Sequence, residues 1–121
     1  MALTKSGSNI VSSQSSSAGS SADAVNSGDI DLTGAYEAVI SGKVTNGATG
    51  PTVGCTINLY VSRDTTNYHL FQSLTAGVAN SGVYPFVFIL PDPVLYAKIG
   101  FGGNTAQSVT VVADLDKITS I

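Results

Sequence analysis

Residues 52–62 read TVGCTINLYVS, and this stretch decides the fold class. Its apolar side chains fall at every second position and alternate with small or polar residues; they are Val53, Cys55, Ile57, Leu59 and Val61. A repeat of two is the pattern of a β-strand with one buried and one solvated face. Because such a strand needs a second apolar face to cover it, the stretch predicts a central strand in a two-layer β-structure.

The remainder of the chain continues this pattern. Further strands are predicted at residues 36–45, 68–76, 83–90, 94–101 and 106–115, separated by turns rich in Gly, Pro and Asn. The Asn46-Gly47 turn favours a hairpin between the strand that precedes it and the central strand. Since no stretch of the sequence shows a sustained helical repeat, we expect an all-β fold. The expected architecture is a β-sandwich or jelly roll of about six to eight antiparallel strands with an extended N-terminal arm.

The first 28 residues differ in composition from the rest. Serine is their commonest residue, and Lys5 and Asp23 are their only charged ones. A segment of this kind buries little surface, so it cannot offset its own ordering entropy. We therefore predict two parts, a Ser-rich N-terminal arm over residues 1–28 and a β-sandwich or jelly-roll domain over residues 29–121. Two readings of the arm stay open, a disordered tail and an arm that becomes ordered on a neighbouring subunit.

Charged residues make up only 11% of the 121 residues, and the formal net charge is −3. A surface so poor in charge must be covered by small polar residues or by other protein. The five basic residues are too scattered to follow a phosphate backbone, so we expect no nucleic-acid partner. No apolar run approaches the roughly 18 residues of a membrane span, and no signal-peptide pattern opens the sequence, so we expect no membrane partner. Cys55, the only cysteine, is predicted to be a small core residue.

Residues suited to catalysis are scarce. His69 is the only histidine, and no nucleophile motif accompanies it, so we expect no enzyme activity and no catalytic residues. Residues 29–34, DIDLTG, match the first half of an EF-hand loop, but its twelfth position holds Ile40 instead of glutamate. We read them as an Asp-rich turn and expect no metal and no cofactor. Tyr60 is the one clearly outward aromatic of the central strand, and it keeps sugar binding open as a weaker alternative.

The stretch at residues 83–90, VYPFVFIL, is apolar on both faces. Pro85 has no N–H for a sheet ladder, which confines the strand to a sheet edge or a bulge. A bare apolar edge promotes aggregation, so we expect a partner subunit or the N-terminal arm to cover it; full burial in its own core is the alternative. The candidate protein-interface residues are Ile10, Val11, Val25, Tyr84, Pro85, Phe86 and Phe88.

Five segments together show a resemblance to a known class of proteins. They are KVTNGATGPTVGCTINLYVS at residues 43–62, DTTN at 64–67, LTAG at 74–77, VYPFVFIL at 83–90 and FGGNT at 101–105. The pattern resembles the small all-β structural proteins of tailed bacteriophages, in particular capsid decoration, or cement, proteins. The resemblance covers about residues 32–115 and rests on strands and turns, so it carries over no functional residue.

This resemblance implies a virion protein and does not choose among head, neck and tail. The first hypothesis is a non-enzymatic protein that binds the outside of a phage capsid and stabilises it by bridging capsomers. The implied partners are the major capsid protein and further copies of the chain itself, in a homo-oligomer such as a trimer. The implied location is the virion, after synthesis in the cytoplasm of the host bacterium. A neck or tail accessory subunit, and a carbohydrate-binding module for host attachment, are the alternative functions.

Overall fold

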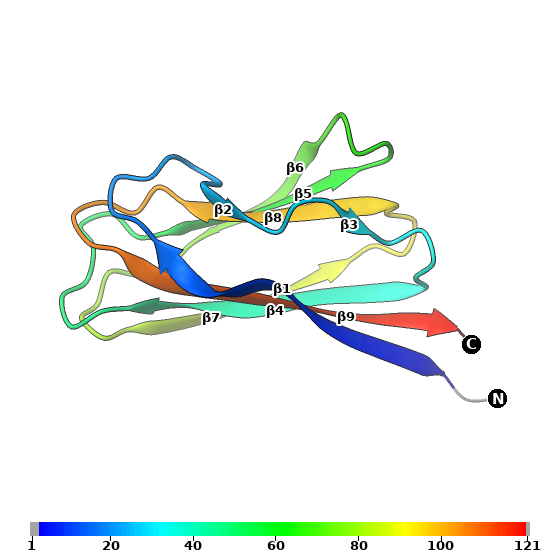
Figure 1. The fold of residues 1–121 in the computed structure, drawn as a ribbon, viewed down its shortest axis with the longest axis horizontal. Coiled ribbons are helices and arrows are strands. Elements are labelled where there is room, and N and C mark those ends of the chain that lie inside the picture. Colours follow the sequence, from blue (N-terminus) through cyan, green and yellow to red (C-terminus); the bar gives the residue numbers. More distant parts are fainter. Residues whose placement is uncertain (1–2, 121) are drawn as a thin grey trace.

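Two antiparallel sheets face each other in the computed structural model, which describes residues 3–120 (Figure 1). The first sheet has the order β1-β9-β4-β7, with β1 at Thr4–Ser16, β4 at Glu37–Asn46, β7 at Val83–Leu90 and β9 at Val109–Ser120. In the second sheet, β8 (Tyr96–Gly102) is followed by β5 (Thr56–Ser62) and β6 (His69–Thr75). Two short strands, β2 (Val25–Asn26) and β3 (Ile30–Asp31), pair with the other side of β8.

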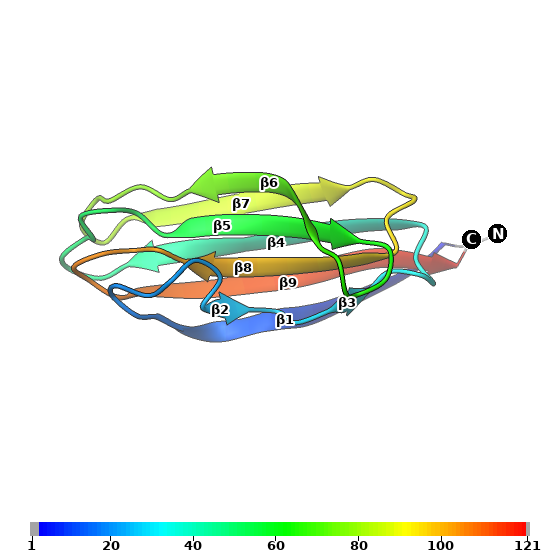
Figure 2. The same ribbon diagram turned by 90° about the horizontal axis from the view of Figure 1, so that it is seen from above.

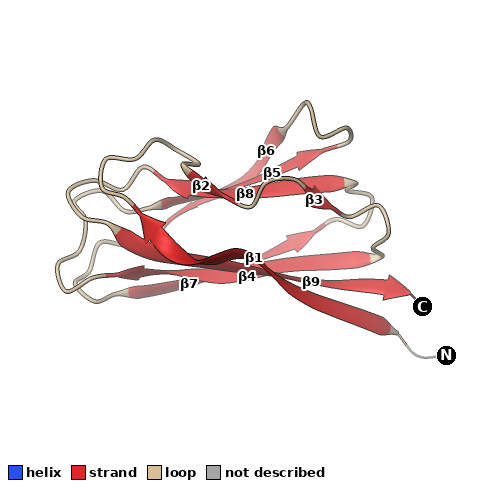
Figure 3. Ribbon diagram, in the orientation of Figure 1, coloured by secondary structure: helices blue, strands red, loops and turns tan. Residues whose placement is uncertain are grey.

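The connectivity is that of a jelly roll. Successive strands alternate between the two sheets, except for β2 and β3 and for the β5–β6 pair. When β2 and β3 are taken as two halves of one strand, the fold has two facing sheets of four strands each. Between residues 3 and 120 every regular element is a strand, as Figure 3 shows. The predicted all-β sandwich is therefore confirmed. Among the described residues, no helix could cross a membrane.

The predicted hairpin between residues 36–45 and 52–62 is wrong. β4 pairs with β7 and β9 in the first sheet, whereas β5 starts only at Thr56 and lies in the second sheet. The segment between them crosses from one sheet to the other. A Cβ at Gly54 would lie 1.8 Å from the carbonyl oxygen of Ala76, so only glycine allows this close passage. Val53, predicted to point inward, is consequently half-exposed.

The core lies between the two sheets and contains the inward side chains of the long strands. Phe101 of β8 is fully buried, and its ring lies 5.8 Å from that of Phe86 on β7. Cys55 is fully buried as predicted, and this burial raises the pKa of its thiol. Gly42, in the middle of β4, is a point of close backbone approach, because a Cβ there would lie 2.0 Å from the carbonyl oxygen of Val112.

The serine-rich N-terminal segment is part of the sandwich. β1 pairs antiparallel with β9 from Thr4 to Ser16, with three register shifts, and the side chain of Val11 is buried in the core. The expectation of an arm separate from the domain is thereby revised, because β9 offers an edge with which the serine backbone can pair. From the end of β1, residues 17–28 pass to the second sheet, where β2 joins the edge of β8 (Figure 1).

Candidate interaction surface

β7 ends the first sheet, and within the described chain it pairs with β4 alone. Its other edge is therefore unpaired, as Pro85 predicted. One face of the strand belongs to the core, where Phe86, Phe88 and Leu90 are buried. The two phenylalanine rings lie 5.4 Å apart between their centroids. β7 is thus firmly attached on its inner side and open on its outer side.

The outer face of β7 carries an apolar row that residues 3–120 leave uncovered. We call Val83, Pro85, Val87 and Ile89 the β7 stripe. The side chains of Val83, Val87 and Ile89 are 52%, 62% and 73% exposed, and Pro85 is exposed between them. Single exposed apolar residues are ordinary on protein surfaces, but a contiguous row along an open edge is a candidate interaction site.

The neighbouring strands give most of the β7 stripe a polar border, whereas the apolar Val39 of β4 lies opposite Ile89. On β4, Lys43 lies opposite Pro85 and Ser41 opposite Val87. One strand further, Asp114 of β9 lies opposite Ser41. The outer face of the first sheet therefore changes from apolar at its β7 edge to charged at β9. An apolar centre with a polar rim is the usual anatomy of a protein interface.

The second sheet ends above β7 in an edge that is also open. All seven residues of β6 are exposed, and they include the large apolar side chains of Leu70, Phe71 and Leu74. Figure 1 shows β6 turning away from the first sheet, and Figure 2 places it on the same side of the molecule as β7. As far as the structure describes the chain, this side of the sandwich therefore has two unpaired strand edges with exposed apolar residues on each.

The turn that leads into β6 is ordered by one carboxylate. Asp64 accepts hydrogen bonds from the backbone N–H groups of Thr66 and Asn67, each at 2.9 Å, and these bonds lower the pKa of its carboxyl group. His69 follows at the start of β6, where it lines an open hollow of about 450 Å³ together with Arg63 and Leu95. Within residues 3–120, no group of three or more His, Cys, Asp or Glu residues could hold a metal ion.

In the structure, most of the predicted interface residues lie in or against the interior of the chain. Val11, Phe86 and Phe88 are buried in the chain's own core, and Ile10 and Val25 pack against it. Tyr84 is half-buried, and its hydroxyl accepts a hydrogen bond from the N–H of Ala79 at 3.1 Å. Pro85 alone of the predicted set is exposed on the β7 stripe.

The aliphatic residues of the stripe were missed, although a signal for them exists. The two faces of β7 differ in size, since one carries aromatic rings and the other carries Val, Pro and Ile. Aromatic rings bury the most apolar area and therefore take the core side of a strand that is greasy on both faces.

Neither a protein-family model nor a curated protein matches the chain. Solved structures with a similar fold include the VP2 subviral particle of infectious bursal disease virus, at 10% identity and a TM-score of 0.59, matched over 98% of this chain. The chain spans about a third of that protein, 32% of its length. The SPBc2 prophage-derived protein YomS is similar over 98% of this chain and 96% of its own, at 11% identity and a TM-score of 0.52.

A third similar structure is a family 16 carbohydrate-binding module. It matches 90% of this chain and 75% of its own, at 15% identity and a TM-score of 0.52. At these identities the likenesses establish a shared β-sandwich fold, which viral capsid proteins, a prophage protein and a sugar-binding module all use.

Proposed function

We propose that this chain is a non-enzymatic structural subunit of a tailed-bacteriophage virion. It binds the outside of the capsid and stabilises the shell by bridging capsomers. The observation that carries the proposal is the uncovered β7 stripe at an unpaired sheet edge, where Ile89 is 73% exposed. Such a surface is suited to binding another protein, because a partner would bury its apolar side chains and form hydrogen bonds with its free backbone groups.

Two further features support the proposal. With 11% charged residues the chain has too few charges to cover its surface, as expected of a subunit that is partly surrounded by protein. The similar structures include a viral particle protein and a prophage-derived protein, so the fold occurs in viral particles.

A stable interface buries about 1,200 to 2,000 Å² in total. The β7 stripe with its polar border on β4 would form the centre of such an interface, with the major capsid protein and neighbouring copies as partners.

The test uses capsids that lack this chain, made by a phage whose genome normally encodes it and from which the gene has been deleted. Purified full-length protein is added, and its binding and the thermal stability of the shells are measured. The double variant Val87→Thr and Ile89→Thr should bind at least about tenfold more weakly, since each lost side chain contributes about 1 kcal/mol or more of apolar burial. Val53→Thr, which changes a half-exposed valine outside β7, is the matched control and should bind normally.

Equal binding of the double variant and the wild type would contradict the assigned surface. Cryo-electron microscopy of the reconstituted particles supplies the second readout. Density at the neck or tail and not on the shell would replace the capsid role by an accessory role there.

A further inference from the structure

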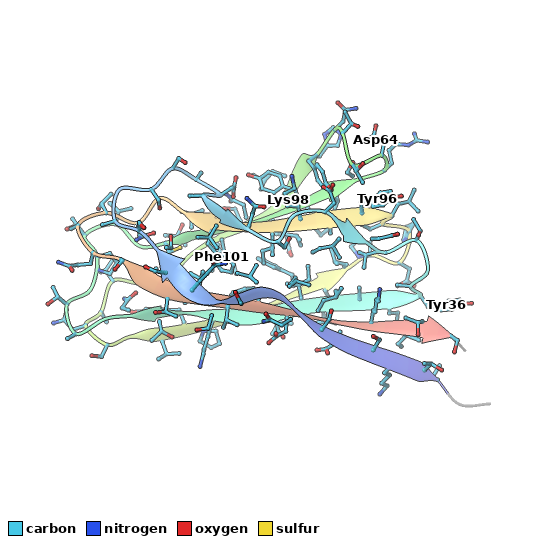
Figure 4. The ribbon with its side chains drawn as sticks, in the orientation of Figure 1. Tyr36, Asp64, Tyr96, Lys98 and Phe101 are labelled. Atoms are coloured by element: carbon cyan, nitrogen blue, oxygen red, sulfur yellow. The ribbon has the colours of Figure 1, made fainter. Side chains whose placement is uncertain are left out.

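The outer face of the second sheet carries a hollow that the proposed capsid contact does not use. It has a volume of about 200 Å³ and is lined by Asp23, Asn26, Tyr60, Tyr68, Lys98 and Gly100. Figure 4 shows Lys98 above the second sheet, on the far side of the sandwich from β4 and β7. One carboxylate, one ammonium group, an amide and two aromatic rings therefore surround a small space on the side away from the β7 stripe.

One wall of the hollow is the segment that precedes β2. It lies directly on β8, because a Cβ at Gly100 would be 2.4 Å from Oδ1 of Asp23 and one at Gly102 would be 2.1 Å from the carbonyl oxygen of Ser21. Asp23 itself has a φ of 61°, a left-handed backbone conformation that few residues other than glycine adopt. The two glycines thus allow the Asp23 carboxylate to lie on the sheet, where it reaches across to β5.

Asp23 fixes the ring of Tyr60. The Tyr60 hydroxyl donates to Oδ2 of Asp23 at 2.5 Å, and the Asn58 amide donates to Oδ1 at 3.1 Å. The hydrogen bond to the carboxylate raises the pKa of Tyr60, so its hydroxyl stays protonated and remains a donor. The ring of Tyr60 is therefore held at its hydroxyl end.

Tyr68 also lines the hollow, and it is held in the same way. Its hydroxyl donates to Oδ1 of Asp29 at 2.6 Å, and burial followed by the effect of Asp29 raises its pKa. Lys98 lies between these groups, with Nζ 4.5 Å from the centroid of the Tyr68 ring and 4.0 Å from Oδ1 of Asp29. Both tyrosine rings are thus oriented before any ligand arrives, which lowers the entropic cost of binding.

We propose that this hollow binds one neutral pyranose ring. The C–H face of a sugar stacks on an oriented tyrosine ring, and its hydroxyl groups can bond both to acceptors and to donors at the rim. Each carboxylate oxygen of Asp23 can accept more than one hydrogen bond, and the Lys98 ammonium has three donors. Asp23 in the lining and Asp29 next to Lys98 together outnumber the single lysine, which disfavours an anionic sugar. The volume is below the roughly 300 Å³ at which drug-sized pockets begin, which suits a single ring.

The experiment titrates the isotope-labelled full chain with glucose, galactose, mannose and N-acetylglucosamine at millimolar concentrations and follows the backbone amide signals by NMR. At least one neutral sugar should shift the signals of Asn26, Tyr60 and Gly100. Tyr68→Ala should weaken this binding about three- to tenfold, the worth of one aromatic contact. Lys98→Met, which keeps an apolar stem but removes the donors, should also weaken it and covers the case in which Tyr68→Ala does not fold.

Tyr36→Ala is the matched control, since Tyr36 is 51% exposed and Figure 4 places it at the end of the first sheet. It should leave sugar binding unchanged. The proposal is overturned if no neutral sugar shifts these signals, if Tyr36→Ala weakens binding as much as Tyr68→Ala, or if glucuronate binds more tightly than glucose. A cluster that only fastens residues 17–28 to the sheet gives the first of these outcomes. Because this site lies on the other sheet, its failure leaves the capsid test unaffected, and the reverse also holds.

Discussion

β1 and β7 are the two edges of the same sheet, yet they are built from opposite kinds of sequence. β1 reads TKSGSNIVSSQSS, and only Val11 and Ser16 of its thirteen residues are buried. β7 reads VYPFVFIL, and its three buried residues alternate with exposed apolar ones. A polar edge strand gives a foreign strand little apolar surface to bury, whereas an apolar one invites pairing. The comparison suggests that the β1 edge is protected against pairing with another chain, whereas the β7 edge is available for it.

The two strands are also attached differently. β7 pairs with β4 through eight consecutive residues without a register shift, and its aromatic side chains anchor it in the core. β1 pairs with β9 along its length, but with three register shifts, and side-chain contacts add to this pairing. At its end, the Ser16 hydroxyl donates to the buried amide oxygen of Asn104 at 2.8 Å. Composition therefore indicates what an edge shows to its surroundings, but it does not indicate whether that edge is ordered.

The largest effect is expected from deleting residues 1–16, which removes β1. The loss of Val11 from the core costs about 2 kcal/mol, and the stranded polar groups around Asn104 cost about 1 to 3 kcal/mol more. We expect the free energy of unfolding to fall by at least about 3 kcal/mol, measured by urea denaturation followed by circular dichroism. Deletion of residues 1–3 is the control and should change little, since Leu3 is half-exposed. An unchanged midpoint for the longer deletion would restore the independent arm that composition predicts.

A smaller loss is expected from Asn104→Ala. The fully buried amide of Asn104 donates to the carbonyl oxygens of Ser16 at 3.0 Å and Gln107 at 2.8 Å. Removing it leaves buried acceptors without partners, so we expect the unfolding free energy to fall by about 2 kcal/mol. Asn80→Ala, which removes an exposed hydrogen bond to the Gly50 N–H, should cost less than about 1 kcal/mol. Equal losses in both variants would show that β1 does not depend on this buried contact.

On β7 the expected effect on stability is smaller still, and the effect on association is large. Val87→Thr with Ile89→Thr changes two exposed side chains, so the unfolding free energy should stay within about 0.5 kcal/mol. Analytical ultracentrifugation should show the wild-type chain associating with itself and the double variant remaining monomeric. If the wild-type chain stays monomeric at all accessible concentrations, the β7 edge is no more available for association than the β1 edge.

The fold class was predictable because it depends on local pattern. Alternation in residues 52–62 indicated the two-layer architecture, and Pro85 indicated that residues 83–90 form an edge strand. The pairing of strands was less accessible, since Asn46-Gly47 marks a turn but does not say whether the chain returns to the same sheet or crosses to the other. That choice is made by distant contacts such as the passage of Gly54 along Ala76, which no local pattern encodes.

The candidate site was half predictable. Alternation divided β7 into two apolar faces, but it could not state which face belongs to the core, and the aromatic face was selected. In the core, the ring of Phe86 packs against those of Phe88 and of Phe101 on β8. The hollow at Tyr60 was harder to foresee. The hydrogen-bond partner of Tyr60, Asp23, lies 37 residues away in the sequence, and it can approach β8 only because Gly100 and Gly102 have no side chains.

The smallest combined effect on stability and association is expected from Ser15→Thr on β1, which introduces the same residue type as the β7 variants. Ser15 lies opposite Thr110 on β9, and both are exposed. Threonine favours strands more than serine does, and a Thr–Thr pair across two strands contributes about 0.2 to 1 kcal/mol. We therefore expect a gain of about 0.5 kcal/mol in urea denaturation, with no change in solution mass. A gain shows that serine makes β1 less stable than it could be, while keeping its edge unsuited to pairing with other strands. A loss would mean that β1 does not keep this register with β9. Ser15→Val extends the test, since self-association through an apolar β1 would show that composition separates the two edges.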